Sequence, residues 1–173
     1  RAEVTPPPLA GHYWSGEIMQ GLRDLAGLSD GQLLTLRYED LFSVQPFYNN
    51  LVTLTLTGAQ LQQVLEQQWA GRTDGGRVLH VSQGFAYSWD SARPIGQRVL
   101  PGSLRLDGQP VDPATPLRVT VNAFLAGGGD SFPLLKEGKD AVTGMMDVDA
   151  LELYVKANPT LAPGPLNRIT RLN

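Results

Sequence analysis

The sequence has no cysteine and only two histidines, His12 and His80, which stand in unrelated contexts. The absence of cysteine excludes disulfides, thiolate zinc sites, iron–sulfur clusters and cysteine nucleophiles. A two-metal phosphohydrolase centre needs several Asp, His and Asn ligands around metals about 3.5–4 Å apart, and neither histidine belongs to such a motif. No serine stands in a nucleophile elbow. We therefore expect no catalytic residue, no metal site and no cofactor in this chain.

The chain is also poor in charge and in long apolar runs. Charged residues make up 18% of the 173 residues, and 14 Lys and Arg against 17 Asp and Glu give a net charge of −3. Without a dense basic cluster the chain has no surface that suits a nucleic-acid polymer. No apolar run approaches the ~18 residues that span a bilayer, which predicts no membrane insertion. The 42% of hydrophobic residues are enough for the core of one domain.

Residue patterns divide the chain into a short arm and one domain. Residues 1–16 include three consecutive prolines and show little periodicity, which predicts an N-terminal arm or linker. The domain is expected to cover residues 17–173. Apolar spacing predicts that it begins with a helix from Glu17 to just before Gly27, followed by a helical turn at 38–42.

The clearest local pattern is a strand followed by a capped helix. Alternation over residues 51–56 predicts the strand. Thr57 then suits the N-cap of a helix that stops before Gly71. The inward positions of the two elements are Val52, Leu54 and Leu56, and Leu61, Val64, Leu65 and Trp69.

The rest of the domain is mainly β. Two short strands are predicted at 78–81 and 85–89, around a turn at 82–84. Alternation predicts another strand at 117–121, and a terminal strand is expected within 166–173. Asp107-Gly108 predicts a two-residue hairpin, and Asp147 is expected to cap a last helix. Trp89 falls on an inward position, as Trp69 does, which favours the core over ligand stacking. Because strands and helices do not alternate regularly, we predict an α+β fold, a mixed β-sheet with flanking helices.

A first candidate ligand segment, VQPFYNN, directly precedes the strand at 51–56. Pro46 disfavours helix before it and holds Phe47 on a defined turn. Asn49 offers amide donors and an acceptor. Phe47 can also be interpreted as a core anchor, the commoner role of a phenylalanine.

A second candidate segment, NAFLAGGGDSFP, directly follows the strand at 117–121. Its glycines permit positive φ and close backbone approach, and Asp130 adds a carboxylate. Interpreted structurally, it is a tight loop with a capping Asp. Loops at strand ends commonly bear binding groups, and the two segments together supply two aromatic rings, an amide and a carboxylate.

With their surroundings, the two segments resemble the C-terminal domain of the 5'-nucleotidase family, which includes bacterial UDP-sugar hydrolases and animal ecto-5'-nucleotidases. The resemblance rests on YEDLFSVQPFYNNLVTLTLTGAQLQQVLE, on GSLRLDGQPVDPATPLRVTVNAFLAGGGDSFPLLKEG, and on the helix that begins at MDVDAL. These stretches cover most of residues 36–155, and the motifs occur in the family's order.

The resemblance implies a division of labour between two domains. In the family, an N-terminal metallophosphoesterase domain holds two divalent metal ions and performs the hydrolysis. The C-terminal domain binds the base and the sugar, and a rotation between domains delivers the phosphate to the metals. This chain would be the nucleotide- or nucleoside-recognition domain, in the periplasm or outside the cell, and we expect the isolated chain to hydrolyse nothing.

The resemblance also implies a role for individual residues. Phe47 and Phe124 would stack on the two faces of the base, at about 1–3 kcal/mol for each face. Asp130 would accept hydrogen bonds from the ribose hydroxyls, as acidic residues do in dinucleotide-binding folds, and Asn49 would read the base. The expected substrate-binding residues are Phe47, Asn49, Phe124, Asp130, Arg23, Gly128 and Gly129.

Arg23 belongs to a stretch that departs from the family. The family has an Asn-x-Gly-Gly-Ile-Arg motif whose Arg binds phosphate, and the matching stretch here is IMQGLR. Gly21 and Arg23 are kept, but Ile18 replaces the Asn and Gln20 replaces a glycine. Arg23 is therefore either a phosphate ligand or a surface helix residue. The departure leaves a second function open, that of a non-catalytic structural or interaction module of an extracellular protein with a decayed pocket.

Overall fold

The structure, a computed structural model, describes residues 38–72, 76–158 and 165–173. The predicted arm at 1–16, the predicted helix from Glu17 and the expected ligand Arg23 lie outside these residues, so the boundary at residue 17 stays a prediction.

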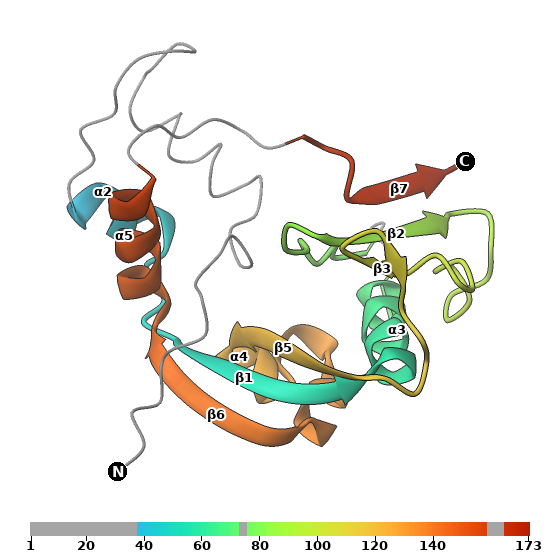
Figure 1. The fold of residues 1–173 in the computed structure, drawn as a ribbon, viewed down its shortest axis with the longest axis horizontal. Coiled ribbons are helices and arrows are strands. Elements are labelled where there is room, and N and C mark those ends of the chain that lie inside the picture. The colour runs from blue at the N-terminus through green and yellow to red at the C-terminus, as the bar shows by residue number, and fades with distance from the viewer. Residues whose placement is uncertain (1–37, 73–75, 159–164) are drawn as a thin grey trace.

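The strands form two sheets (Figure 1). The first is antiparallel, in the order β5-β1-β6, with β1 at Asn50–Thr57, β5 at Pro116–Asn122 and β6 at Lys139–Met146. The second has the order β4-β3-β2-β7, with β2 at Phe85–Asp90, β3 at Arg105–Leu106, β4 at Gln109–Pro110 and β7 at Ile169–Leu172. Its β7 runs parallel to β2, whereas its other pairs are antiparallel. The predicted α+β fold with a mixed β-sheet and flanking helices is confirmed, with the strands divided between two sheets.

The helices lie around these sheets (Figure 1). The α-helices are α2 (Tyr38–Val44), α3 (Gly58–Glu66), α4 (Ala123–Ala126) and α5 (Asp147–Ala157). Three 3₁₀ helices are η1 (Gln67–Trp69), η2 (Gly129–Ser131) and η3 (Pro133–Glu137).

The predicted strand and capped helix are confirmed as β1 and α3. The hydroxyl of Thr57 accepts a hydrogen bond from the N–H of Gln60 at 3.2 Å, and the Gln60 side chain accepts one from the N–H of Thr57 at 2.9 Å. This reciprocal capping box satisfies two backbone donors that the first helical turn leaves free. The direct connection from strand to helix sets α3 against the end of the first sheet.

The helix α3 lies between the two sheets and contributes to both of their cores (Figure 1). Val64 is buried with Leu54 and Leu56 of β1. The next residue, Leu65, and Trp69 of η1 are buried against the second sheet, whose inward residues are Phe85, Tyr87 and Trp89. The rings of Trp69 and Trp89 lie 4.7 Å apart, and both side chains are buried, as predicted.

The predicted strand at 78–81 is wrong, because its backbone bonds to the end of a helix instead of to a sheet. The N–H of Leu79 donates to the buried side-chain oxygen of Gln68 at 2.6 Å, and the N–H of Arg77 donates to the Gln68 carbonyl at 2.8 Å. The segment therefore follows η1 as irregular chain. The Asp107-Gly108 hairpin is confirmed, with φ of 50° and 78° at its two residues.

Candidate functional site

Strand register brings the two candidate segments to one end of the first sheet. Leu51, near the start of β1, pairs with Asn122 at the end of β5, and Asn50 pairs with Met146 at the end of β6. The chain therefore enters β1 from residues 45–49 and leaves β5 into 123–131 at the same end. Two segments more than seventy residues apart in the sequence share one region of the surface.

The two candidate aromatic rings are exposed at this end. Phe47 is 65% exposed and Phe124 is 54% exposed. The interpretation of Phe47 as a core anchor is therefore wrong. Exposed rings of this size are available to stack on a flat ligand, and Tyr48, 58% exposed, adds a third ring beside Phe47.

Buried contacts with α5 fix the segment that bears Phe47. The side-chain amide of Gln45, which is buried, donates to a carboxylate oxygen of Asp147 at 3.1 Å. The N–H of Asp147 donates to the carbonyl of Asn49 at 2.8 Å. Asp147 is fully buried and is the first residue of α5, where its other carboxylate oxygen accepts from the N–H of Val148 at 2.8 Å. The prediction that Asp147 caps this helix is wrong, because the N-cap position is Met146 and no side-chain cap hydrogen bond is present there. Asp147 instead anchors both ends of the turn at 45–49.

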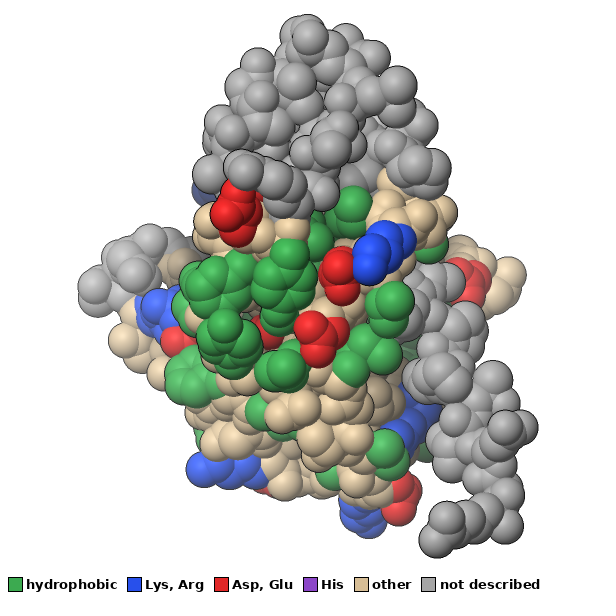
Figure 2. All heavy atoms as spheres, turned by 90° about the vertical axis from the view of Figure 1, so that its left-hand side faces the viewer, with side chains coloured by type: hydrophobic (Ala, Val, Ile, Leu, Met, Phe, Trp, Pro, Cys, Tyr) green, Lys and Arg blue, Asp and Glu red, His purple; other side chains and the backbone are tan. Residues whose placement is uncertain are grey.

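Side-chain packing adds to this anchoring. The rings of Phe42 in α2 and Tyr48 lie 5.0 Å apart. Beneath them, Leu41 is buried with Val148 and Leu151 of α5. Figure 2 shows hydrophobic side chains gathered on this side of the molecule, where α2 and α5 lie, with acidic side chains among them.

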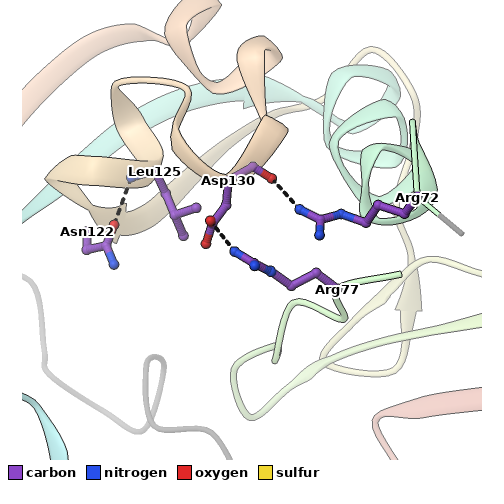
Figure 3. Close-up of polar contacts among 5 residues, drawn as sticks. All are labelled: Arg72, Arg77, Asn122, Leu125 and Asp130. Atoms are coloured by element: carbon purple, nitrogen blue, oxygen red, sulfur yellow. Dashed lines mark hydrogen bonds and ion pairs between the residues drawn. The ribbon is translucent and has the colours of Figure 1, made fainter. Parts of the chain in front are cut away.

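The segment that bears Phe124 begins with a helix cap. The side-chain oxygen of Asn122 accepts from the N–H of Leu125 at 2.8 Å and so starts α4 (Figure 3). The ring of Phe124 then packs directly on the backbone of Gly129, because a Cβ on Gly129 would lie 2.6 Å from two ring atoms. Gly128 has a φ of 78° and lies in the left-handed region. These two glycines shape the loop that bears the ring.

Two arginines bind Asp130, the expected ribose ligand (Figure 3). A guanidinium nitrogen of Arg77 forms an ion pair with Oδ1 of Asp130. A guanidinium nitrogen of Arg72 donates to the Asp130 carbonyl at 3.1 Å. Both arginines come from the segment after α3 and η1, far from Asp130 in the sequence, and our sequence analysis did not identify them. No local motif marks them, since the contact depends on how α3 lies against the first sheet.

The part of the chain that the structure describes contains no cluster of metal ligands. Within residues 38–72, 76–158 and 165–173, no group of three or more His, Cys, Asp and Glu side chains could hold a metal ion. The two-metal centre that the resemblance implies for an N-terminal domain therefore does not fit this part of the chain. In the same part of the chain, no helix combines the length and the apolar character that crossing a membrane requires.

Comparison with known proteins identifies relatives along most of the chain. The family model "5'-nucleotidase, C-terminal domain" matches residues 15–137. A 5'-nucleotidase-related protein of Glossina morsitans morsitans is 32% identical over 154 residues, which cover 84% of this chain and 27% of that protein. Protein UshA of Escherichia coli is 28% identical over 142 residues, which cover 82% of this chain and 24% of that protein.

A solved structure has the same fold. The 5'-nucleotidase precursor from Thermus thermophilus matches with a TM-score of 0.70 and 29% sequence identity, over 94% of this chain and 36% of that chain. The chain therefore spans about a quarter to a third of the length of these relatives.

Proposed function

The chain belongs to the family of 5'-nucleotidase C-terminal domains, and from this premise we propose that it is the nucleotide- or nucleoside-recognition domain of a 5'-nucleotidase-type phosphohydrolase. The observation that supports the proposal is the exposure of Phe47 and Phe124 on two segments that leave the same end of one sheet. Neither ring is buried in the core. The backbone that bears each ring is nevertheless held by hydrogen bonds, with Asp147 for Phe47 and with Asn122 for Phe124. Exposed and positioned aromatic side chains are typical of a binding site.

In this proposal each group binds one part of the ligand. Phe47 and Phe124 stack on the base, which tolerates purines and pyrimidines because every base has a π-face. Asn49 reads the base edge, and Asp130 accepts from the ribose hydroxyls through its carboxylate. Gly128 and Gly129 let the chain approach the ligand closely beside Phe124. Arg23 would bind the phosphate.

Hydrolysis is assigned to a separate N-terminal metallophosphoesterase domain with two divalent metal ions, located with this domain in the periplasm or outside the cell. This chain would supply affinity and orientation, which lower the barrier by holding the substrate in a reactive position. The rigorously purified chain of 173 residues is expected to release no phosphate from AMP with Mn²⁺ or Mg²⁺. Turnover that stays proportional to the amount of chain through purification would contradict this assignment.

Calorimetric titration with adenosine tests recognition directly. Saturable binding is expected, and Phe124→Ala should weaken it by roughly fivefold to 150-fold, the equivalent of one stacking face at about 1–3 kcal/mol. Ile95→Ala is a matched control, because Ile95 is a hydrophobic side chain of similar exposure, 50%, in the chain after β2. No heat of binding at millimolar adenosine, or equal effects of the two variants, would contradict the proposal.

An interaction module is the second candidate function, and a different observation favours it. Tyr38 of α2, Tyr48 of the turn before β1 and Leu153 of α5 are 45%, 58% and 44% exposed. Figure 2 shows hydrophobic side chains together on the side of the molecule where α2 and α5 lie. A chain that binds no nucleoside, but whose binding to another protein is lost in Tyr38→Ala, would support this candidate over the first.

A further inference from the structure

We infer that Arg77 and Arg72 are positioning residues that hold Asp130 in the geometry needed to bind a ribose diol, an inference that rests on the proposed function. The two arginines bind two different groups of the same residue, the carboxylate and the backbone carbonyl (Figure 3). Asp130 is thereby fixed in both its side chain and its main chain.

The main chain at Asp130 needs such support. Asp130 has a φ of 53° and Ser131 a φ of 70°, so two consecutive residues with side chains adopt the left-handed region. This conformation is unfavourable for residues other than glycine and persists only where the surroundings impose it. The hydrogen bond from Arg72 to the Asp130 carbonyl is one such constraint.

The ion pair holds the Asp130 carboxylate but uses only part of its capacity to accept hydrogen bonds. Arg77 engages Oδ1, while no hydrogen bond or ion pair to Oδ2 is present among the described residues. A carboxylate has about four lone-pair sites, so Oδ2 and the second lone pair of Oδ1 can accept from two adjacent hydroxyls. The ion pair therefore orients the acceptor and leaves lone pairs on the carboxylate for a vicinal diol.

Hydrogen bonds to buried residues hold the backbone of both arginines. The N–H of Arg77 donates to the carbonyl of Gln68 at 2.8 Å, and the N–H of Arg72 donates to the carbonyl of Trp69 at 3.3 Å. Gln68 is fully buried and Trp69 is 1% exposed, so both acceptors belong to the core. The support for Asp130 thus comes from the core between the two sheets, and it links the ligand loop to α3.

The inference predicts an effect that is confined to ligands with a diol. In calorimetric titrations, Arg77→Ala should weaken adenosine binding about fivefold, the size expected for a partly exposed charge pair. It should leave the binding of 2',3'-dideoxyadenosine unchanged, because that ligand lacks the 2' and 3' hydroxyls from which Asp130 would accept hydrogen bonds. Arg77→Lys keeps the positive charge and should recover most of the loss. Arg105→Ala is the control, since it removes an equal charge whose hydrogen bonds within the described residues go to the carbonyls of Gly102 and Leu104.

A double variant separates an action through Asp130 from a direct contact with the ligand. If Arg77 acts through Asp130, the double variant of Arg77→Ala and Asp130→Asn binds adenosine no more weakly than Asp130→Asn alone. Effects that multiply, or an Arg77→Ala loss that is equal for adenosine and its dideoxy analogue, would overturn the inference. So would an Asp130→Asn loss limited to adenosine together with no effect of Arg77→Ala.

The same set of titrations distinguishes failure of the inference from failure of the proposed function. If Asp130→Asn weakens adenosine and the dideoxy analogue equally, Asp130 does not bind the diol, and the ribose assignment itself is wrong. Melting temperatures of all variants, measured beside the titrations, establish that each one is folded. Arg77 is half exposed, so its replacement is compatible with the fold.

Discussion

Replacement of Gly129 by alanine should displace the ring of Phe124 and thereby weaken nucleoside binding, with little change in the stability of the fold. The added Cβ would lie 2.6 Å from Cε1 and Cζ of the ring and 2.7 Å from Cδ1. Carbon atoms in contact prefer about 3.5–4.0 Å, so the ring has to move by about 1 Å.

The cost to stability is small because the ring can move into solvent. Phe124 is 54% exposed, and Gly129 does not have the positive φ of its neighbour Gly128, so alanine adds no backbone strain there. We expect the free energy of unfolding in urea to fall by less than about 1 kcal/mol. Nucleoside affinity should fall by up to the value of one stacking face, about 1–3 kcal/mol.

Gly127→Ala is the matched control in the same loop. Its added Cβ would lie 3.4 Å from the carbonyl oxygens of Ala123 and Phe124 and would touch no ring atom. Calorimetry with adenosine and urea unfolding should be run on both variants. Wild-type affinity in Gly129→Ala, or a loss of several kcal/mol in its stability, would refute the reasoning.

Two further predictions concern buried polar groups. Asp147→Ala removes the acceptor for the buried Gln45 amide and should lower the free energy of unfolding in urea by about 2 kcal/mol; an unchanged midpoint would contradict this. Burial raises the pKa of Tyr87 to about 12, while its hydrogen bond with Gln68 lowers it by less. Because the unfolded chain releases this proton near pH 10, stability should fall between about pH 10 and pH 12, by roughly 2–3 kcal/mol. Tyr87→Phe should remove that fall relative to the exposed control Tyr48→Phe; equal pH profiles in the two variants would contradict it.

Local patterns predicted those parts of the fold whose hydrogen bonds are local. Thr57 and Gln60 are three residues apart, and the capping box that they form is legible in the sequence. Asp107-Gly108 likewise determines its own turn, because both residues adopt the positive φ that the hairpin needs. The alternation at Phe85, Tyr87 and Trp89 predicted a half-buried strand, and all three side chains are buried.

Parts of the fold that depend on distant partners were not predicted. The strand β6 has the sequence KDAVTGMM, with two charges and a glycine, and most of its residues are exposed. Its neighbour in the described sheet is β1, about ninety residues earlier. Its sequence shows no alternation of buried and exposed residues from which a strand could be predicted. The strand predicted at 78–81 is wrong for a different reason. Its apolar residues suit a strand, but the N–H of Leu79 donates to the side chain of Gln68 instead of to a neighbouring strand.

The candidate site divides in the same way. Phe47, Phe124 and Asp130 stand in motifs next to clear strands, so their neighbourhood was predictable from the residues and from the family resemblance. Arg72 and Arg77 reach Asp130 across the interface between α3 and the loop after β5, a contact that follows from tertiary packing alone.

Val64 and Leu65 are consecutive in α3, yet one points into the core of the antiparallel sheet and the other into the core of the mixed sheet. The helix α3 is thus part of both hydrophobic cores. Because α3 packs in both cores, unfolding of one core exposes one face of α3 and destabilises the other core. We therefore expect both sheets to unfold together in a single cooperative transition. The loop that bears Asp130 should lose its support in the same transition, because Arg72 and Arg77 are held by the carbonyls of Trp69 and Gln68 in η1, which directly follows α3.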